Sequence, residues 1–229
     1  HETDRLVGKK GGILMQKEAY QSFTDKYAQV TPANVLNAAT DGTITFAYTN
    51  PYTSSTGLNI LTAMLYSFDS SDPLSTTASN ALMEYQKTAP PVAYTTAVLR
   101  NQASKGLIDC MVMEEQAYIN TPALKDYVYV PFGIRHDHPV YTFDWNTPEE
   151  NEAARLFLDY CLSDEAQKLA TEKGFNRHDE YVSVDPGLSG TGYISAQKIW
   201  KQNKNGGRPI ACVFVADISG SMKGTPLQS

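Results

Sequence analysis

Residues 46–65 constrain the fold of this chain more than any other stretch. An apolar run of β type is followed by Asn50-Pro51, a cluster of hydroxyls and Gly57, and apolar residues then recur at helical spacing from Leu58 onward. This order predicts a strand, a tight loop and a helix whose first turn is surrounded by hydroxyls. The hydroxyl-bearing residues of the cluster are Thr53, Ser54, Ser55 and Thr56.

The start of this helix is a candidate ligand site. The first four N–H groups of a helix have no partner within the helix, and a Ser or Thr cap satisfies one of them. The remaining N–H groups, the hydroxyls and the positive end of the helix dipole suit an oxyanion or another polar ligand. An ordinary N-cap after a strand has the same pattern, so the spacing alone leaves both interpretations open.

Strand-like and helix-like segments alternate through the first half of the chain. Strands are predicted at 6–15, 43–48 and 107–113, and helices near 19–27, 31–39, 58–68, 77–87 and 94–105. Such alternation predicts an α/β fold, with a parallel or mixed sheet that has helices on its faces. The last of these strands runs into Glu114 and Glu115, which either face a ligand or form a solvated strand end.

The second half contains further strands and the clearest helices. Strands predicted at 128–134 and 140–143 flank His136-Asp137-His138, which is either a polar surface turn or part of a metal site without a third ligand nearby. A capping box at Thr147 opens one helix, and Ser163 caps the next. The residues expected to form the buried stripe of the first of these helices are Ala153, Leu156, Phe157, Tyr160 and Cys161.

Two of these segments resemble one known family. The string T-N-P-Y-T-S-S-T-G at 49–57 is similar to the ligand loop of bacterial extracellular solute-binding proteins of the two-lobed, type II periplasmic-binding kind. Residues 157–175 resemble the late helix pair of the same proteins. The resemblance implies a non-enzymatic α/β lobe that binds a small polar or anionic solute outside the cytoplasm. With the cap of the helix at 94–105 included, the candidate ligand-binding residues are Thr53, Ser54, Ser55, Thr56, Gly57, Thr95, Thr96 and Glu114.

A third segment resembles a different family. The string A-C-V-F-V-A-D-I-S-G-S-M at 211–222 is similar to the first strand and the D-x-S-x-S loop of a von Willebrand factor type A domain, which is Rossmann-like. The resemblance implies that Asp217, Ser219 and Ser221 hold Mg²⁺ or a similar divalent cation, whose preferred ligands are hard oxygens. The remaining ligands of that family come from later loops. We therefore expect an incomplete metal shell and no cofactor here, and a complete metal-ion-dependent adhesion site that binds a protein partner only in the full-length protein.

The apolar run before this loop has its own consequence. Residues 210–216 have the composition of a central strand that is covered on both faces. An apolar strand with open edges pairs readily with another sheet or chain. We expect Cys212–Val215 to join a sheet edge of this chain or of a neighbouring copy, or to be ordered by parts of the protein outside this sequence.

Taken together, the resemblances predict three parts. Residues 1–130 are expected to form a solute-binding α/β lobe, residues 131–201 the return strands and late helices, and residues 202–229 a polar linker with the first strand of the von Willebrand-type domain. The resembled proteins have a further lobe before the matched segment, and the chain begins without a signal peptide, so we expect a fragment of a larger protein. The expected location is extracellular or at the cell surface, with a lipoprotein or other membrane anchor outside this sequence.

Composition excludes some partners. A formal net charge of −6 and a pI near 5.2 argue against nucleic acid or an anionic membrane surface as the main partner. No run approaches the ~18 apolar residues of a membrane span. Cys110, Cys161 and Cys212 have no metal-binding spacing and are expected to be small buried hydrophobic residues.

Two further classes of function stay open. An α/β enzyme fragment could use the Ser/Thr loop, although the sequence has neither a G-x-S-x-G motif nor a phosphate-binding loop. The second class is an interaction scaffold that binds no ligand.

Overall fold

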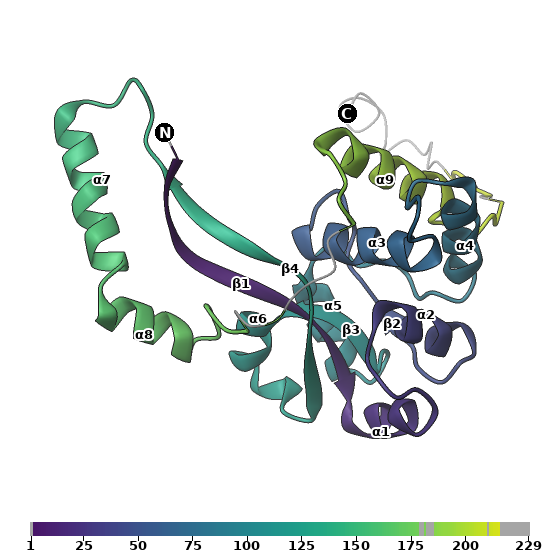
Figure 1. The fold of residues 1–229 in the computed structure, drawn as a ribbon. Coiled ribbons are helices and arrows are strands. Elements are labelled where there is room, and N and C mark those ends of the chain that lie inside the picture. The colour runs from purple at the N-terminus through teal and green to yellow at the C-terminus, as the bar shows by residue number, and fades with distance from the viewer. Residues whose placement is uncertain (1, 179–180, 182–185, 210, 216–229) are drawn as a thin grey trace, which may run out of the picture.

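The computed structural model describes residues 2–178, 181, 186–209 and 211–215, and these residues form a mixed sheet flanked by helices (Figure 1). The strands are β1 (Glu2–Gln16), β2 (Phe46–Ala47), β3 (Cys110–Glu114) and β4 (Tyr127–Tyr141), in the order β2-β3-β1-β4. β1 is antiparallel to β3 and β4, and β2 is parallel to β3. The α/β class with a mixed sheet is therefore as the sequence predicts.

The helices begin where the sequence places their caps. Thr31, Ser54, Thr95 and Ser163 each accept, through the side chain, the N–H three residues further on, and Thr147 and Glu150 form the predicted capping box. The helices are α1 (Lys17–Lys26), α2 (Pro32–Thr40), α3 (Ser55–Phe68), α4 (Thr76–Gln86), α5 (Thr96–Ser104), α6 (Glu115–Ile119), α7 (Pro148–Cys161), α8 (Asp164–Glu172) and α9 (Gly190–Asn203), with a 3-10 turn at Pro122–Leu124.

β1 and β4 continue past the rest of the sheet as a curved two-stranded ribbon that leads toward α7 (Figure 1). The prediction of two strands separated by a polar turn is wrong, because β4 is a single strand. His136, Asp137 and His138 lie inside it and pair with Lys9, Gly8 and Val7 of β1, respectively. This long-range pairing satisfies the backbone of a segment whose polar composition is typical of a turn.

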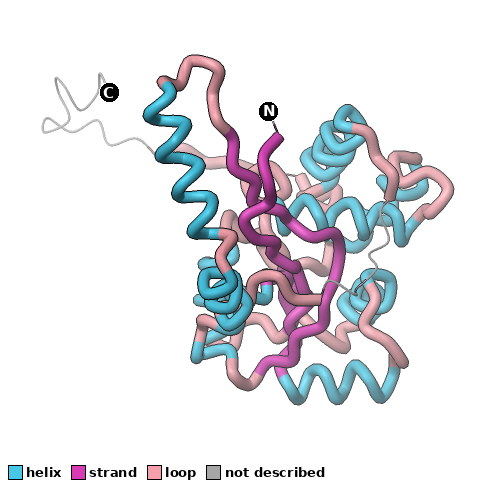
Figure 2. Tube along the Cα trace, turned by 60° about the vertical axis from the view of Figure 1, so that its left-hand side comes forward, coloured by secondary structure: helices cyan, strands magenta, loops and turns pink. Residues whose placement is uncertain are grey.

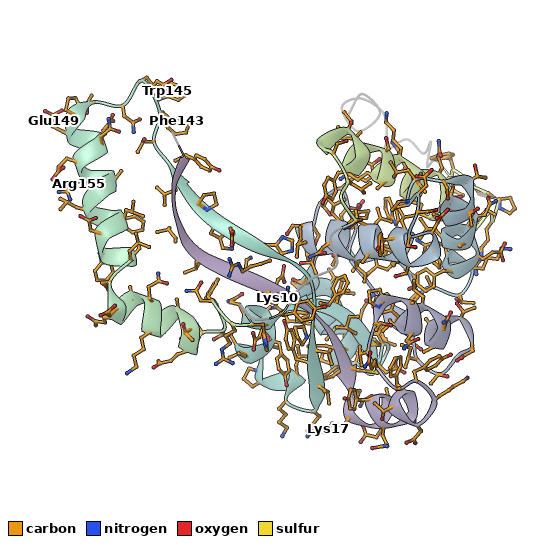
Figure 3. The ribbon with its side chains drawn as sticks, viewed as in Figure 1. Lys10, Lys17, Phe143, Trp145, Glu149 and Arg155 are labelled. Carbon is orange, nitrogen blue, oxygen red and sulfur yellow. The ribbon has the colours of Figure 1, made fainter. Side chains whose placement is uncertain are left out.

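Lys10 is a buried basic residue of the ribbon. The Lys10 side chain is almost fully buried, donates a hydrogen bond to the carbonyl oxygen of Gly133 and lies 4.2 Å from the centroid of the Tyr181 ring. Burial lowers the pKa of Lys10. Figure 3 places Lys10 near the middle of β1, whereas Phe143 and Trp145 stack on each other at the far end of the ribbon, with ring centroids 4.5 Å apart.

α9 returns to the main body of the molecule and packs against α3 and α4 (Figure 1). The buried Trp200 ring donates its Nε1–H to the hydroxyl of Tyr48 over 2.8 Å, and Gln86 also donates to that hydroxyl. Tyr48 itself is buried just after β2. The boundary expected between residues 130 and 131 lies within β4, and α9 packs against α3 and α4, while the division into three parts stays a prediction.

α7 departs from the sequence prediction in its burial. Its expected apolar stripe exists, but no residue of α7 is buried, and Leu156, Phe157 and Tyr160 are 56%, 59% and 62% exposed. Figures 1 and 2 show the reason, since α7 stands apart from the sheet and joins α8 at the far side of the ribbon. The periodicity predicted the helix correctly, but no described element covers the face.

The end of the described chain also differs from the prediction. Residues 211–215 form no strand, and Val213, Phe214 and Val215 are 86%, 90% and 93% exposed. Cys212 is exposed and Cys161 only partly buried, so of the three cysteines Cys110 alone is the buried residue expected. Cys212–Val215 therefore joins no sheet edge of the described chain. Pairing with a neighbouring copy, or ordering by parts of the protein outside this sequence, stays a prediction.

Three residues of the predicted metal loop lie outside the described residues: Asp217, Ser219 and Ser221.

Gly57, in the first turn of α3, allows a close approach of two segments. A Cβ atom at this position would lie 2.2 Å from the carbonyl oxygen of Thr49. We expect Gly57→Ala to lower the free energy of unfolding by about 1–3 kcal/mol, as overpacking does. A Cβ atom added to Gly190, in the first turn of α9, would have no atom from outside its own stretch of helix within 4 Å. We expect Gly190→Ala to be neutral or slightly stabilising.

Urea denaturation of the two variants measures both free energies. Equal stability of Gly57→Ala and Gly190→Ala would contradict the close approach of Thr49 to α3.

Candidate functional site

The loop before α3 is held by its own hydroxyls. The Ser54 hydroxyl accepts the Gly57 N–H at 3.2 Å and also accepts a hydrogen bond from the Thr49 hydroxyl at 2.8 Å. The N–H groups of Ser55 and Thr56, in the first turn, have no carbonyl partner within the helix. The strand, tight loop and helix that the sequence predicts here are therefore present, and Ser54 is the cap.

A second loop lies beside the first. Ala93 forms a parallel β-bridge with Thr49, and the Thr53 hydroxyl donates to the carbonyl oxygen of Tyr94 at 3.0 Å. The next residue, Thr95, caps α5, and Thr96 is the first residue of that helix. The helix starts at Ser54 and Thr95 are thus neighbours, which is the arrangement that a shared site would require.

Thr56 and Gly57 face inward. Thr56 is buried, and its hydroxyl donates to Oε1 of Glu114 at 2.5 Å. Gly57 is buried against Thr49, and its N–H is bonded to Ser54. These two residues position α3 and the Glu114 carboxylate, and Gly57 in particular leaves no group for the ligand contact that the sequence predicted.

A pocket of about 290 Å³ lies beside the start of α3. It brings together three elements that are far apart in the sequence, namely α3, the β4 side of the ribbon and α9. Of the residues predicted to bind ligand, only Ser55 is on its wall. The described residues that line it are Ser55, Leu58, Asn59, Thr62, Ile134, His136 and Tyr193.

Asn59 fastens α3 to the ribbon. Its side-chain Nδ2 donates to the carbonyl oxygen of Ile134 at 3.0 Å, and its Oδ1 accepts the Ile134 N–H at 3.3 Å. Gly133 has a φ of 68° and lies so close to Asn59 that a Cβ atom would meet Oδ1 at 2.3 Å, so a glycine is needed there. The Asn59 side chain in the pocket wall is therefore fixed in place without a ligand.

His136 is the histidine of the lining. Burial lowers its pKa, the Glu114 carboxylate opposes this change, and the positive charge of Lys9 adds to it. The imidazole is therefore neutral at pH 7. Its Nε2 lies 3.5 Å from Nδ2 of Asn59. The sequence predicts this histidine only in a polar turn or a metal site, because its approach to α3 depends on the β1–β4 pairing.

No metal centre is present among the described residues, where no group of three or more His, Cys, Asp or Glu side chains is close enough to hold an ion. His136 and His138 are two positions apart on β4 and therefore share a face, but no third ligand among the described residues lies beside them. Nor is any helix in the described ranges both long and apolar enough to span a membrane.

Comparison with known proteins identifies the family. The sequence profile of bacterial extracellular solute-binding proteins matches residues 3–176, which is most of the chain. The chain belongs to this family. Solute-binding proteins of this kind are extracellular or periplasmic and are generally non-enzymatic, in agreement with the sequence prediction. No curated protein sequence matches the chain significantly.

Solved structures show the same fold. A periplasmic thiamin-binding protein has a TM-score of 0.62 at 13% identity, with 89% of this solute-binding protein and 66% of that protein covered. Maltose-bound MalE3 from T. maritima has a TM-score of 0.58 at 18% identity, covering 93% and 63%. A ribitol-bound solute-binding protein from Agrobacterium radiobacter has a TM-score of 0.55 at 12% identity, covering 75% and 51%. This chain thus spans less than two thirds of each relative.

His136 predicts a pH dependence of stability. An unfolded histidine titrates near pH 6.5, and the pKa of His136 is lower in the folded state. Between these two pKa values the unfolded state binds more protons, so stability rises with pH. We expect the free energy of unfolding to fall as the pH drops through this window, and we expect His136→Gln to reduce the fall. The pKa of His138 is lowered too, so it contributes to the remainder.

Urea denaturation at pH 7.5 and 5.5 tests this dependence. The Asp69 carboxylate acts at lower pH, since hydrogen bonds from Ser71 and Ser75 lower its pKa to about 2, whereas burial raises the pKa of Asp109, so that residue opposes the fall and Asp109→Asn serves as its control. Identical stability of the unmodified protein at the two pH values would contradict a buried, neutral His136.

Proposed function

We propose that this chain binds a small polar solute, without chemical change of the solute, in the pocket between α3, the β4 ribbon and α9. The observation that carries the proposal is the pocket itself, which lies at the hydroxyl-capped start of α3 in a chain of the solute-binding family. Its size and its mixture of apolar and polar side chains are those of a small-molecule site. The similar proteins named above are described with thiamin, maltose and ribitol, which gives the size class of the solute.

The lining residues offer two kinds of contact to a solute, polar and apolar. Ser55 offers a hydroxyl and a first-turn N–H, and His136 offers a neutral imidazole. Leu58, Ile134 and Tyr193 offer apolar contact. Thr53, Ser54, Thr95 and Thr96 stay in the proposal as residues of the adjoining rim, because the two helix caps are neighbours.

We also propose that the solute is enclosed from a second side by residues outside this chain. The structural relatives are longer, and α7 and the ribbon end, which both carry exposed apolar residues, lie on one side of the molecule (Figure 3). A lone lobe would then bind more weakly than the full protein, because the contacts from the second side are missing.

The coupling to a von Willebrand-type domain rests on the sequence motif alone. We propose that Asp217, Ser219 and Ser221 take part in a Mg²⁺ site only when the remaining ligands are supplied. The completed domain then binds a protein partner, and the full-length protein is anchored at the cell surface. Calorimetric titration with Mg²⁺ distinguishes the cases, since specific heat is expected from a chain extended through the whole domain and none from this chain.

A pocket-filling substitution tests the proposed site. We expect a bound solute at 100 times its dissociation constant to raise the melting temperature by roughly 5–10 °C. Ser55→Phe places a large ring at the pocket wall from an exposed helix position, so the solute should no longer raise the melting temperature. Ser22→Phe makes the same change at an exposed position of α1 and should keep the full response.

Thermal shift with a panel of neutral, anionic and cationic small solutes provides the measurement. A solute that stabilises Ser55→Phe as much as the unmodified protein would move the site elsewhere.

A further inference from the structure

Glu114 places a carboxylate beside the proposed solute pocket. It ends β3 and is partly exposed. Its side chain is held by the buried Thr56 hydroxyl, one residue after Ser55 of the pocket wall. Its partner across the sheet is Gly11, where a Cβ atom would lie 4.0 Å from Nδ2 of Asn59. The hydrogen bond from Thr56 thus brings Glu114 next to the part of α3 that lines the pocket, and its charge acts on His136 of the wall, although Glu114 is not itself a lining residue.

The start of α3 therefore has an anion of its own. From the sequence, this helix end is suited to an oxyanion, but the protein already supplies a carboxylate at the second residue of the helix. A carboxylate near a helix N-terminus is favourable, and it removes the attraction that an incoming anion would gain. Within the described residues, Glu114 makes no ion pair that would cancel its charge.

Among the residues that the structure describes, the pocket wall supplies no cation for an anionic solute. None of its residues is Lys or Arg, and burial keeps the His136 imidazole neutral at pH 7. The positive charge on the ribbon closest in register is Lys9, which pairs with His136 across the ribbon and shares its face. Lys9 is not part of the wall, but its charge opposes the entry of an organic cation. Within the described residues, the charges that act on His136 therefore include the Glu114 carboxylate and the ammonium groups of Lys9 and Lys10, none of which lies on the pocket wall.

We propose that this pocket selects an uncharged polyhydroxy solute, such as a sugar or polyol, and that Glu114 is the residue that sets this preference by accepting solute hydroxyls and repelling oxyanions. Charge-assisted hydrogen bonds from hydroxyls to a carboxylate are short and strong. Ser55 and the neutral imidazole complete the polar contacts, and Tyr193 with Leu58 contacts the carbon skeleton. The inference rests on the proposed function, because it names the solute class of the same pocket.

Isothermal calorimetry with three classes of probe tests the preference. The probes are uncharged solutes (ribitol, maltose and a set of monosaccharides), the oxyanions molybdate and phosphate, and the cation thiamin. We expect an uncharged solute to bind and the ionic probes not to bind. Glu114→Gln removes the charge and keeps the shape, so it should weaken binding of the uncharged solute at least about tenfold. Glu114→Asp should restore part of the affinity, and Glu84→Gln, an exposed charge removal on α4, should have no effect.

A second readout shows whether Glu114 acts through its charge. The carboxylate raises the pKa of His136, so NMR titration of His136 should give a lower pKa in Glu114→Gln than in the unmodified protein or in Glu84→Gln. Binding of molybdate, phosphate or thiamin to the unmodified protein in preference to every uncharged probe would overturn the inference and leave the proposed function standing. Unchanged affinity of the uncharged solute for Glu114→Gln would do the same. No binding of any probe would count against the proposed function and the inference together.

Discussion

The structure depends on the pairing of β1 with two strands at once. Ile13, Leu14 and Met15 pair with β3 on one side and with β4 on the other, and all three side chains are buried. This double pairing places the end of β3, with Glu114, beside the start of α3. It also extends β4 past the sheet, so that His136 reaches the same helix. Without β1, β3 and β4 would not be held in one sheet, and the pocket residues would not be brought together.

Local signals in the sequence predicted much of the fold. Hydroxyl caps at Thr31, Ser54, Thr95 and Ser163 and the capping box at Thr147 are satisfied within a few residues of the chain, so they can be read without tertiary information. The helix after the hydroxyl cluster and the neighbouring loop at Thr95 are present as expected.

The remaining features depend on contacts between distant segments. His136 lies in a strand because it pairs with Lys9, 127 positions earlier, although its neighbours have the composition of a turn. Asn59 and Tyr193 reach the pocket from the middle of α3 and from α9, and neither has a local motif that marks it. The stripe of α7 was predicted from periodicity, which shows that a face is apolar but not what covers it.

The pocket is built before a solute arrives. Asn59 and Thr56 of α3 are bonded to Ile134 of β4 and Glu114 of β3, and Trp200 of α9 is bonded to Tyr48 just after β2, so both helices of the pocket are held by polar contacts. Each such bond contributes only about 1 kcal/mol to stability, but leaving its buried partner unpaired costs more. The arrangement therefore favours one geometry, in which the solute replaces water on a rigid surface and orders few side chains.

Hydrogen–deuterium exchange, with and without a solute that raises the melting temperature, tests the central claim that the pocket beside α3 is the binding site. We expect the solute to slow exchange at residues 53–60 and at 132–138, because binding reduces local opening of the segments that contact it. Slower exchange confined to α7, α8 or residues 211–215, with the start of α3 unchanged, would contradict the account.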